Sequence, residues 1–246
     1  MEKIFFKVDG DNLFGTILYP SKLKDKNPAV LFVHGWTSSQ KSYIPRAEAV
    51  SKCGAICMTF NLRGHGDSGG NIKEFSRKDH LKDVIKAYDF LVSLPKADKN
   101  KIGVVGASYG GYLSSILISK RKVKWFVLRA PALYKDNDFN TPTFSLNKED
   151  VRVYRQSKIN PKNNYALKAL TRFKNEVVLI ECEKDSIVPK QTIQNYEKAL
   201  KNNKNYSYIL LSKADHELST EEFKKAFIDI LLKVFTNWFK KDLLNS

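Results

Sequence analysis

Short apolar runs, bounded by polar or turn-forming residues, recur along the chain. A strand that is buried on both faces shows such a continuous run, whereas a strand with one solvated face alternates between apolar and polar residues. We therefore predict that these runs form a mostly parallel sheet with both faces covered. The runs are Ala29–Val33, Ala55–Phe60, Ile102–Val105, Lys124–Ala130, Val177–Cys182 and Tyr206–Leu211.

Between these runs, apolar residues recur with the period of a helix. His80–Leu94 has the i, i+3, i+4 spacing of an amphipathic helix. A final helix is predicted after Ser219–Glu222, an S-x-x-E capping box. Its apolar stripe, Phe223–Phe239, could lie on a membrane surface, but we expect it to pack on the sheet. Two further helices are predicted at Ala47–Cys53 and Lys190–Lys201.

Strand and helix patterns alternate along most of the chain. Lys3–Val8 and Asn12–Tyr19 flank the turn Asp9-Gly10-Asp11, which predicts an N-terminal hairpin. Periodicity is lost after Pro131 and returns at about Tyr165. We predict one α/β domain over residues 1–246, with about eight strands, helices on both faces and a short cap insertion at about residues 131–165.

The segment Lys101–Tyr112 carries the clearest chemical signal. It joins a buried strand to a predicted helix through Gly106-Ala107-Ser108-Tyr109-Gly110, a G-x-S-x-G match. A serine between a strand and a helix sits on a strained turn, where flanking glycines avoid clashes that a Cβ would make. Such a turn exposes the Ser108 hydroxyl at the end of the sheet, so Ser108 is a candidate nucleophile.

A serine hydroxyl needs a base to take its proton, and the base needs an acid to orient it. Among the four histidines, His216 follows the last predicted strand, and Asp185 directly follows the strand before it. Loops after parallel strands meet at one edge of a sheet, so both side chains can approach Ser108. Asp215 is the alternative acid, but adjacent loop residues seldom present their side chains to each other.

The other polar residues of these loops have structural interpretations. We expect His34 and His65 to organise their loops and His80 to be a solvated helix start. Arg63 is expected to tie its loop by hydrogen bonds, although contact with a substrate anion is the alternative.

The chain order Ser108, Asp185, His216 and its loop contexts resemble the α/β-hydrolase family. The resemblance implies a serine hydrolase whose oxyanion hole is formed by the backbone N–H groups of Trp36 and Tyr109. Within the family the chain resembles cinnamoyl/feruloyl-esterase-like, monoacylglycerol-lipase-like and prolyl-oligopeptidase-like members. The supporting motifs are HGW at residues 34–36, RGHGDSGG at 63–70, GASYGG at 106–111, KDSIVP at 184–189 and ADH at 214–216.

The cap insertion is rich in aromatic residues. They form either a lid over an acyl or aromatic pocket, as in cinnamoyl esterases, or they hold a short loop against the core. The candidates for the pocket are Tyr134, Phe139, Phe144 and Tyr154.

Composition adds limits to the function. The formal net charge of +16 would suit an anionic partner, but the lysines form no continuous tract, so we expect solvated faces and no nucleic-acid partner. The three cysteines stand in apolar surroundings and are expected to be free thiols. No metal, cofactor, signal peptide or membrane span is expected. A cytoplasmic location and a possible homodimer complete the expectations.

The predicted activity is a carboxylesterase that cleaves small or medium acyl or aromatic esters. An acyl peptidase or aminopeptidase and an acyl-CoA thioesterase are the alternatives within the same chemistry. A ligand-binding protein that keeps the fold without turnover is the alternative from another class.

Overall fold

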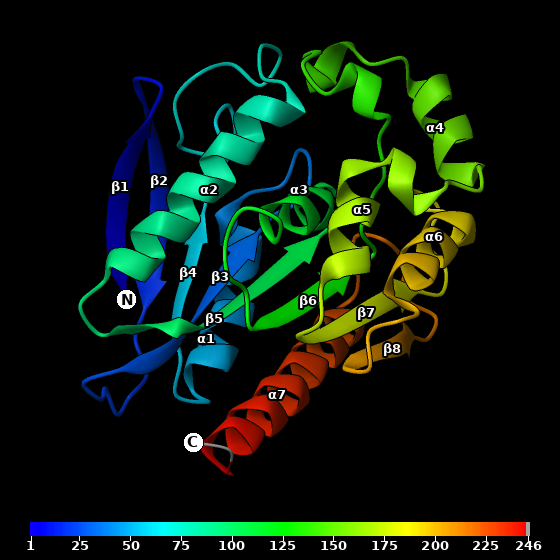
Figure 1. Cartoon of the computed structure of the whole chain (residues 1–246). Coiled ribbons are helices and arrows are strands. Elements are labelled where there is room, and N and C mark those ends of the chain that lie inside the picture. The colour runs from blue at the N-terminus through cyan, green and yellow to red at the C-terminus, as the bar shows by residue number, and fades with distance from the viewer. Residues whose placement is uncertain (245–246) are drawn as a thin grey trace.

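The fold is built on one sheet of eight strands in the order β1-β2-β4-β3-β5-β6-β7-β8 (Figure 1). It is seen in a computed structural model that describes residues 1–244. Strands β3 to β8 run parallel to one another. β1 and β2 form an antiparallel hairpin, and β2 pairs antiparallel with β4. The strands are β1 (Glu2–Val8), β2 (Asp11–Leu18), β3 (Asn27–Val33), β4 (Ile56–Phe60), β5 (Ala97–Ala107), β6 (Trp125–Arg129), β7 (Glu176–Cys182) and β8 (Tyr206–Leu211).

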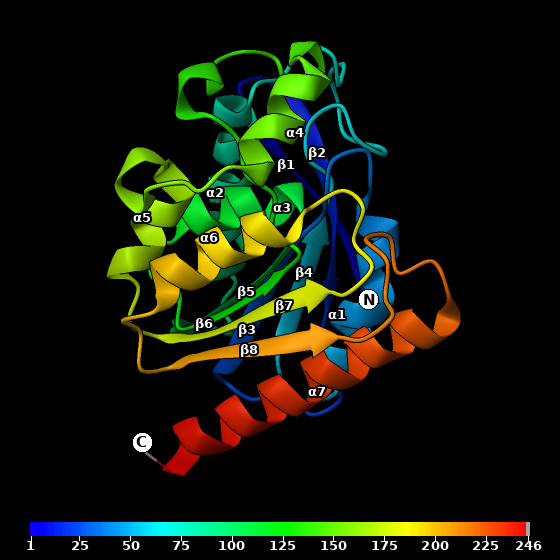
Figure 2. The ribbon, with the colours of Figure 1, turned by 90° about the vertical axis from the view of Figure 1, so that its right-hand side faces the viewer.

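Helices cover both faces of the sheet (Figure 2). α1 and α7 pack together on one face, and α2, α3, α5 and α6 follow one another on the other face. Each face has its own apolar core. Short 3-10 turns lie at Gln40–Tyr43, Asp136–Asp138, Thr143–Ser145 and Pro161–Asn163. The helices are α1 (Ile44–Ser51), α2 (Arg77–Ser93), α3 (Tyr109–Leu117), α4 (Lys148–Gln156), α5 (Tyr165–Arg172), α6 (Lys190–Leu200) and α7 (Glu221–Leu244).

The predicted α/β fold is confirmed, including the N-terminal hairpin and the parallel central strands. The hairpin turn holds Asp9 and Gly10 at φ values of 47° and 97°, which is the left-handed region that such two-residue turns require. The stripe of α7 packs as expected, because Phe227, Leu231 and Phe235 are fully buried in the core beneath the sheet.

Two helix boundaries differ from the prediction. α1 begins at Ile44 rather than Ala47, because Pro45 fits the first turn of a helix, where no N–H is needed. α7 is capped by Thr220, whose hydroxyl accepts from the N–H of Phe223 at 3.2 Å. The predicted cap residue, Ser219, instead hydrogen-bonds the carboxylate of Asp215. The capping box was therefore placed one residue too early.

The insertion after Pro131 contains a helix that periodicity did not predict. α4 has no fully buried residue, and its apolar stripe is limited to Val151 and Tyr154, which are half-buried against the core. Asn147 caps it by accepting from the N–H groups of Glu149 and Asp150. α4 lies beyond the ends of α5 and α6 and contacts α6 (Figure 1). The division of the chain into a single domain with this insertion as its cap stays a prediction.

Candidate active site

Ser108 lies on a sharp turn between β5 and α3. Its φ and ψ of 52° and −119° place a non-glycine residue in a strained conformation. The backbone of β6 holds the turn, since the N–H of Ser108 donates to the carbonyl of Arg129 at 3.0 Å. A Cβ on Gly110 would lie 2.3 Å from a β3 carbonyl oxygen, and one on Gly106 would lie 2.8 Å from the carbonyl of Gly110. Both glycines of the motif are therefore required by close backbone approach.

The structure brings the three predicted site residues into one hydrogen-bonded relay. His216 Nε2 lies 3.0 Å from Ser108 Oγ, and its Nδ1 lies 2.7 Å from Asp185 Oδ2. The three residues come from the loops after β5, β7 and β8, which end at the same edge of the sheet. The side chains of His216 and Asp185 are only 7% and 5% exposed, so water competes little for their contact. This is the geometry that nucleophile activation requires.

The two candidate acids have different partners. The second oxygen of Asp185, Oδ1, accepts from the N–H groups of Ile187 and Val188 at 2.8 and 2.7 Å. Asp215 instead accepts from the hydroxyl and the N–H of Ser219, and the hydroxyl contact is the larger cause of its lowered pKa. Asp185 therefore faces His216, and Asp215 faces away into its own turn.

The loop after β3 approaches the nucleophile from the neighbouring strand. A Cβ on Gly35 would lie 3.9 Å from Ser108 Oγ, so the segment that carries Trp36 lies beside the hydroxyl. The Trp36 ring packs edge-on against His65, His80 and Tyr109, at centroid distances of 5.2, 5.8 and 5.3 Å. Tyr109 is the first residue of α3, where the backbone N–H has no intrahelical acceptor. Both predicted oxyanion-hole residues therefore lie next to Ser108 in the fold.

The prediction that His80 is a solvated helix start is wrong. His80 is fully buried, and its Nδ1 lies 2.8 Å from the hydroxyl of Tyr109. α2 begins at Arg77 with a capping box between Ser76 and Asp79, which turns His80 toward the core. Burial lowers the pKa of His80 to about 3, so the ring is neutral at ordinary pH. The Tyr109 hydroxyl also reaches Thr143 of the insertion at 3.2 Å, which links the elbow to the cap.

The remaining loop residues agree with their structural interpretations. His34 Nε2 accepts from the N–H of Leu62, and His65 Nδ1 lies 2.9 Å from the carbonyl of Arg63. The buried Arg63 guanidinium binds Asp83 at 2.7 Å and so ties its loop to α2. Burial lowers the pKa of His34 to about 3 as well.

Arg129 is a site residue that sequence reasoning missed. Its guanidinium is buried at the end of β6 and donates to the backbone carbonyl of His216 at 2.6 Å. The same nitrogen lies 3.5 Å from the sulfur of Cys182. The signal was available, because a charged residue inside the apolar run Lys124–Ala130 must find a partner when that strand is buried. Arg129 fixes the loop that carries His216.

The four aromatic candidates of the cap do not share one cavity. Tyr134 is buried and packs on Tyr109 with ring centroids 5.7 Å apart. Tyr134 and Tyr154 both line a cavity of about 160 Å³ within the cap. Phe139 packs on Tyr165 and lines a different groove. Phe144 is 55% exposed, and its ring lies 5.3 Å from the ammonium of Lys73. A substrate role for these residues stays a prediction.

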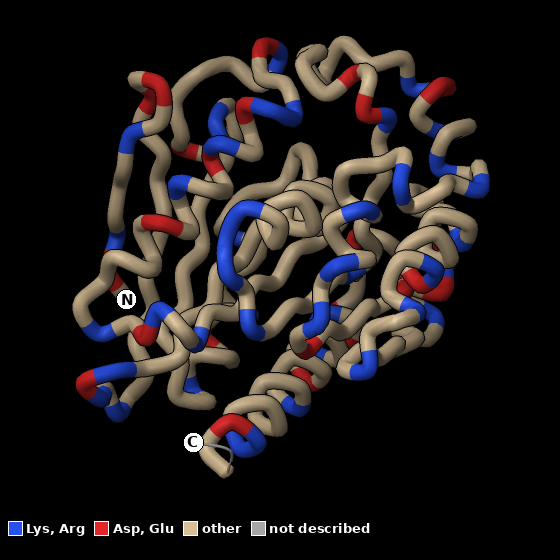
Figure 3. The backbone as a smooth tube through the Cα atoms, in the orientation of Figure 1, with Lys and Arg blue, Asp and Glu red and all other residues tan. Residues whose placement is uncertain are grey.

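Charged residues are spread over the molecule rather than gathered in one tract (Figure 3). Within residues 1–244, no cluster of three or more histidine, cysteine or acidic side chains could hold a metal ion. No helix in that part of the chain has the length and apolar character needed to cross a membrane. Cys53, Cys57 and Cys182 are free thiols.

Comparison with known proteins agrees with the geometry. The model of the prolyl oligopeptidase family matches residues 41–242 of this chain. Among solved structures, the ferulic-acid-bound Est1E of Butyrivibrio proteoclasticus superposes with a TM-score of 0.74 at 15% identity, covering 99% of this chain and 100% of that one. At this identity the likeness shows the α/β-hydrolase fold. The predicted resemblance to that fold family and to its prolyl-oligopeptidase-like members is confirmed.

Curated relatives match over shorter stretches. A putative esterase/lipase 2 of Mycoplasma genitalium is 28% identical over 144 residues, which is 57% of this chain and 48% of the relative. The human mitochondrial palmitoyl-protein thioesterase ABHD10 is 33% identical over 94 residues, which is 37% of this chain and 29% of the relative. The chain thus spans less than half the length of these relatives.

Proposed function

This chain belongs to the prolyl oligopeptidase family, and on that premise we propose that it is a serine hydrolase of carboxylic esters. The observation that carries the proposal is the relay in which His216 lies 3.0 Å from Ser108 Oγ and 2.7 Å from Asp185. In this proposal Ser108 is the nucleophile, His216 the general base and Asp185 the acid that orients it. The substrate is a small or medium acyl or aromatic ester.

The reaction starts when Ser108 Oγ attacks the acyl carbonyl carbon and passes its proton to His216 Nε2. Asp185 accepts a hydrogen bond from the Nδ1–H of His216 and stays ionised, which fixes the tautomer and stabilises the imidazolium. The tetrahedral intermediate expels the alcohol, which takes its proton from His216 Nε2. Water then attacks the acyl-enzyme with the same base, and the carboxylic acid leaves with Ser108 restored.

The backbone N–H groups of Trp36 and Tyr109 stabilise the oxyanion of each tetrahedral intermediate in this proposal. Donors held in place before the reaction act without reorganisation, and each contributes roughly 3 kcal/mol in comparable sites. Support comes from the packing of the Trp36 ring on that of Tyr109, at 5.3 Å, which keeps the two residues side by side. Tyr134, packed on Tyr109, would border the acyl group on the cap side, and Tyr154, Phe139 and Phe144 are its candidate neighbours.

Two other bond types use the same machinery. The family name favours a peptide bond, and the thioesterase named among the relatives favours a thioester. Both differ from an ester only in the leaving group, so the relay supports all three. Cytoplasmic action and a homodimer stay predictions.

The test uses p-nitrophenyl acetate, butyrate and octanoate with the intact protein and with Ser108→Ala. We expect turnover of at least one ester, its loss in Ser108→Ala, and labelling of the intact protein alone by a fluorophosphonate. Chain-length preference then measures the acyl pocket. Labelling that persists in Ser108→Ala would refute the assignment of Ser108 as the nucleophile.

Other outcomes separate the alternatives. A protein that is labelled but cleaves none of the esters is next given an aminoacyl p-nitroanilide and an acyl-CoA. Cleavage of the anilide would assign a peptidase, and cleavage of the acyl-CoA would assign a thioesterase. A protein that is neither labelled nor active fits the ligand-binding alternative.

A further inference from the structure

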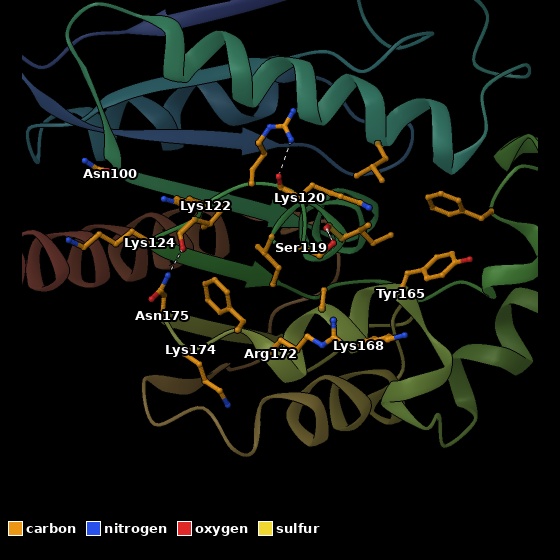
Figure 4. Close-up of a pocket in the computed structure, with 18 residues that line it drawn as sticks. Asn100, Ser119, Lys120, Lys122, Lys124, Tyr165, Lys168, Arg172, Lys174 and Asn175 are labelled. Atoms are coloured by element: carbon orange, nitrogen blue, oxygen red, sulfur yellow. Dashed lines mark hydrogen bonds between the residues drawn. The ribbon is translucent and has the colours of Figure 1, made fainter.

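A groove of about 1040 Å³ lies between α2 and α5, over the last turn of α3 (Figure 4). Its wall is formed by residues of those helices and by the loop from α3 to β6. Ser108 precedes the first turn of α3, whereas Ile116 of the groove lies in its last turn. With a rise of 1.5 Å per residue, Ile116 lies about 12 Å along the helix axis from the nucleophile, and the groove lining includes none of Ser108, Asp185 and His216. It is therefore separate from the relay described above.

The floor of the groove is apolar. Leu81 from α2, Ile116 from α3 and Phe173 after α5 line it, each between 5% and 8% exposed. Val123 and Ala169 extend this surface along the groove. A volume in the range of small-molecule sites with an apolar lining suits a hydrocarbon chain.

The rim of the groove is basic. Its described lining holds seven lysine and arginine residues and no aspartate or glutamate. Figure 4 shows several of them around the floor, with Lys120 and Lys122 on the loop after α3 and Lys168 and Arg172 on α5. Two further cations are already paired, Arg121 with Asp89 and Lys124 with Asp242.

The seventh, Lys174, donates to the carbonyl of Asn202 at 3.4 Å, which leaves Lys120, Lys122, Lys168 and Arg172 as the cations available to a ligand. The ion pairs found within residues 1–244 involve none of these four side chains, and the one acidic group with an electrostatic effect on them is Asp136, which interacts with Lys168. All four side chains are exposed at the rim, and they come from two segments that face each other across the floor. Cations outnumber the acidic groups beside them at this rim, so the like charges repel one another, and a bound anion relieves that repulsion.

We propose that this groove binds a single-chain anionic amphiphile, a long-chain fatty acid, with its carboxylate at the basic rim and its hydrocarbon chain on the apolar floor. The commitment to a fatty acid follows from the pairing of the two features in one recess. A nucleic acid would use the charges, but the floor offers it aliphatic side chains between helices rather than an open aromatic surface for stacking bases. The groove lining includes none of Ser108, Asp185 and His216, and it shares with the proposed acyl pocket only the candidate residue Phe139.

The first test is calorimetric titration with myristate, on protein whose Ser108 is blocked by a fluorophosphonate. The block removes the active site as a competing acyl site, so binding reports the groove. We expect saturable binding of one myristate, weakened by salt because the charges are exposed. Tetradecyltrimethylammonium, with the same chain and the opposite charge, is expected to bind at least ~10-fold more weakly, since the rim would repel it.

The matched variants are Lys122→Glu with Lys168→Glu, and Lys162→Glu with Lys201→Glu. Both pairs change the net charge equally, but Lys162 and Lys201 are exposed residues outside the groove lining. The groove pair is expected to weaken myristate at least ~10-fold, and the control pair less than ~2-fold. Circular dichroism verifies that both pairs fold.

Several results would overturn the proposal. Myristate binding that is lost on fluorophosphonate blocking would place the chain in the active site. If both variant pairs weakened myristate binding equally, the attraction would be a general effect of net charge. If the cationic amphiphile bound as tightly as myristate, the hydrocarbon chain would bind without help from the basic rim. Binding only to vesicles of phosphatidylglycerol, with none of free myristate, would make the face a membrane contact.

Discussion

Replacement of Asp185 by asparagine tests the relay with a single atom change. Oδ1 of Asp185 accepts two backbone N–H groups, from Ile187 and Val188, at 2.8 and 2.7 Å. An amide side chain must keep its oxygen at those donors, so its NH₂ group faces His216 Nδ1. Nδ1 must then accept, which leaves the proton of a neutral ring on Nε2, facing Ser108. The base cannot take the serine proton in that tautomer.

We expect Asp185→Asn to lower kcat by about 10⁴-fold with KM little changed, which corresponds to about 5.5 kcal/mol of barrier. The assay is steady-state cleavage of the best p-nitrophenyl ester near neutral pH. Asp215→Asn is the matched control, because its carboxylate serves only the turn at Ser219 and is expected to cost less than ~3-fold. Activity of Asp185→Asn within 10-fold of the unmodified protein, or a larger loss in Asp215→Asn, would refute the assignment.

Three further predictions concern the residues that support the site. Arg129→Met removes the donor to the His216 carbonyl at 2.6 Å, so kcat should fall about 10- to 100-fold at unchanged far-UV dichroism, and unchanged kcat would contradict a positioning role. Gly110→Ala places a Cβ 2.3 Å from a β3 carbonyl and should cost about 3 kcal/mol in urea unfolding, whereas Gly69→Ala, with its nearest atom at 3.4 Å, should cost less than ~1 kcal/mol. In the folded protein the pKa of His80 is about 3, so the ring is neutral, whereas in the unfolded chain it protonates below its ordinary pKa of 6.5. The contribution of His80 to folding stability is therefore complete above pH 6.5 and is lost as the pH falls toward 3. Between pH 7 and 5.5, His80→Gln should therefore lose about 1.2 kcal/mol less stability than the unmodified chain, and identical losses would contradict the buried neutral ring.

The sheet and the relay could be predicted because both follow from patterns within short segments of the sequence. Continuous apolar runs correspond to buried strands, and the end of each run places the next loop at the active edge of the sheet. Asp185 and His216 follow such runs, so parallel topology alone brings them toward Ser108. The sequence also favoured Asp185 over Asp215, because adjacent loop residues seldom present their side chains to each other, and Asp185 is the acid that contacts His216.

Residues whose role depends on tertiary neighbours were harder to predict. The prediction of a solvated His80 is wrong because the helix begins earlier, at Arg77. The capping box between Ser76 and Asp79 marks this start. Arg129 has a long-range partner 87 residues away, which no local pattern reveals. The helix α4 is harder to predict because its apolar stripe is only one turn long, Val151 and Tyr154, and neither residue is fully buried.

The position of β8 at the edge of the sheet has a consequence for how the protein loses activity. β8 pairs only with β7, and several of its side chains are exposed, among them Tyr208 and Leu210. Edge elements with few buried contacts open locally at lower free energy than the centre of a fold. The loop after β8 carries His216, while Ser108 follows the central β5. Detachment of this one strand would displace His216 while the nucleophile and most of the core stay folded, so we expect mild denaturant to abolish activity before the fold as a whole is lost.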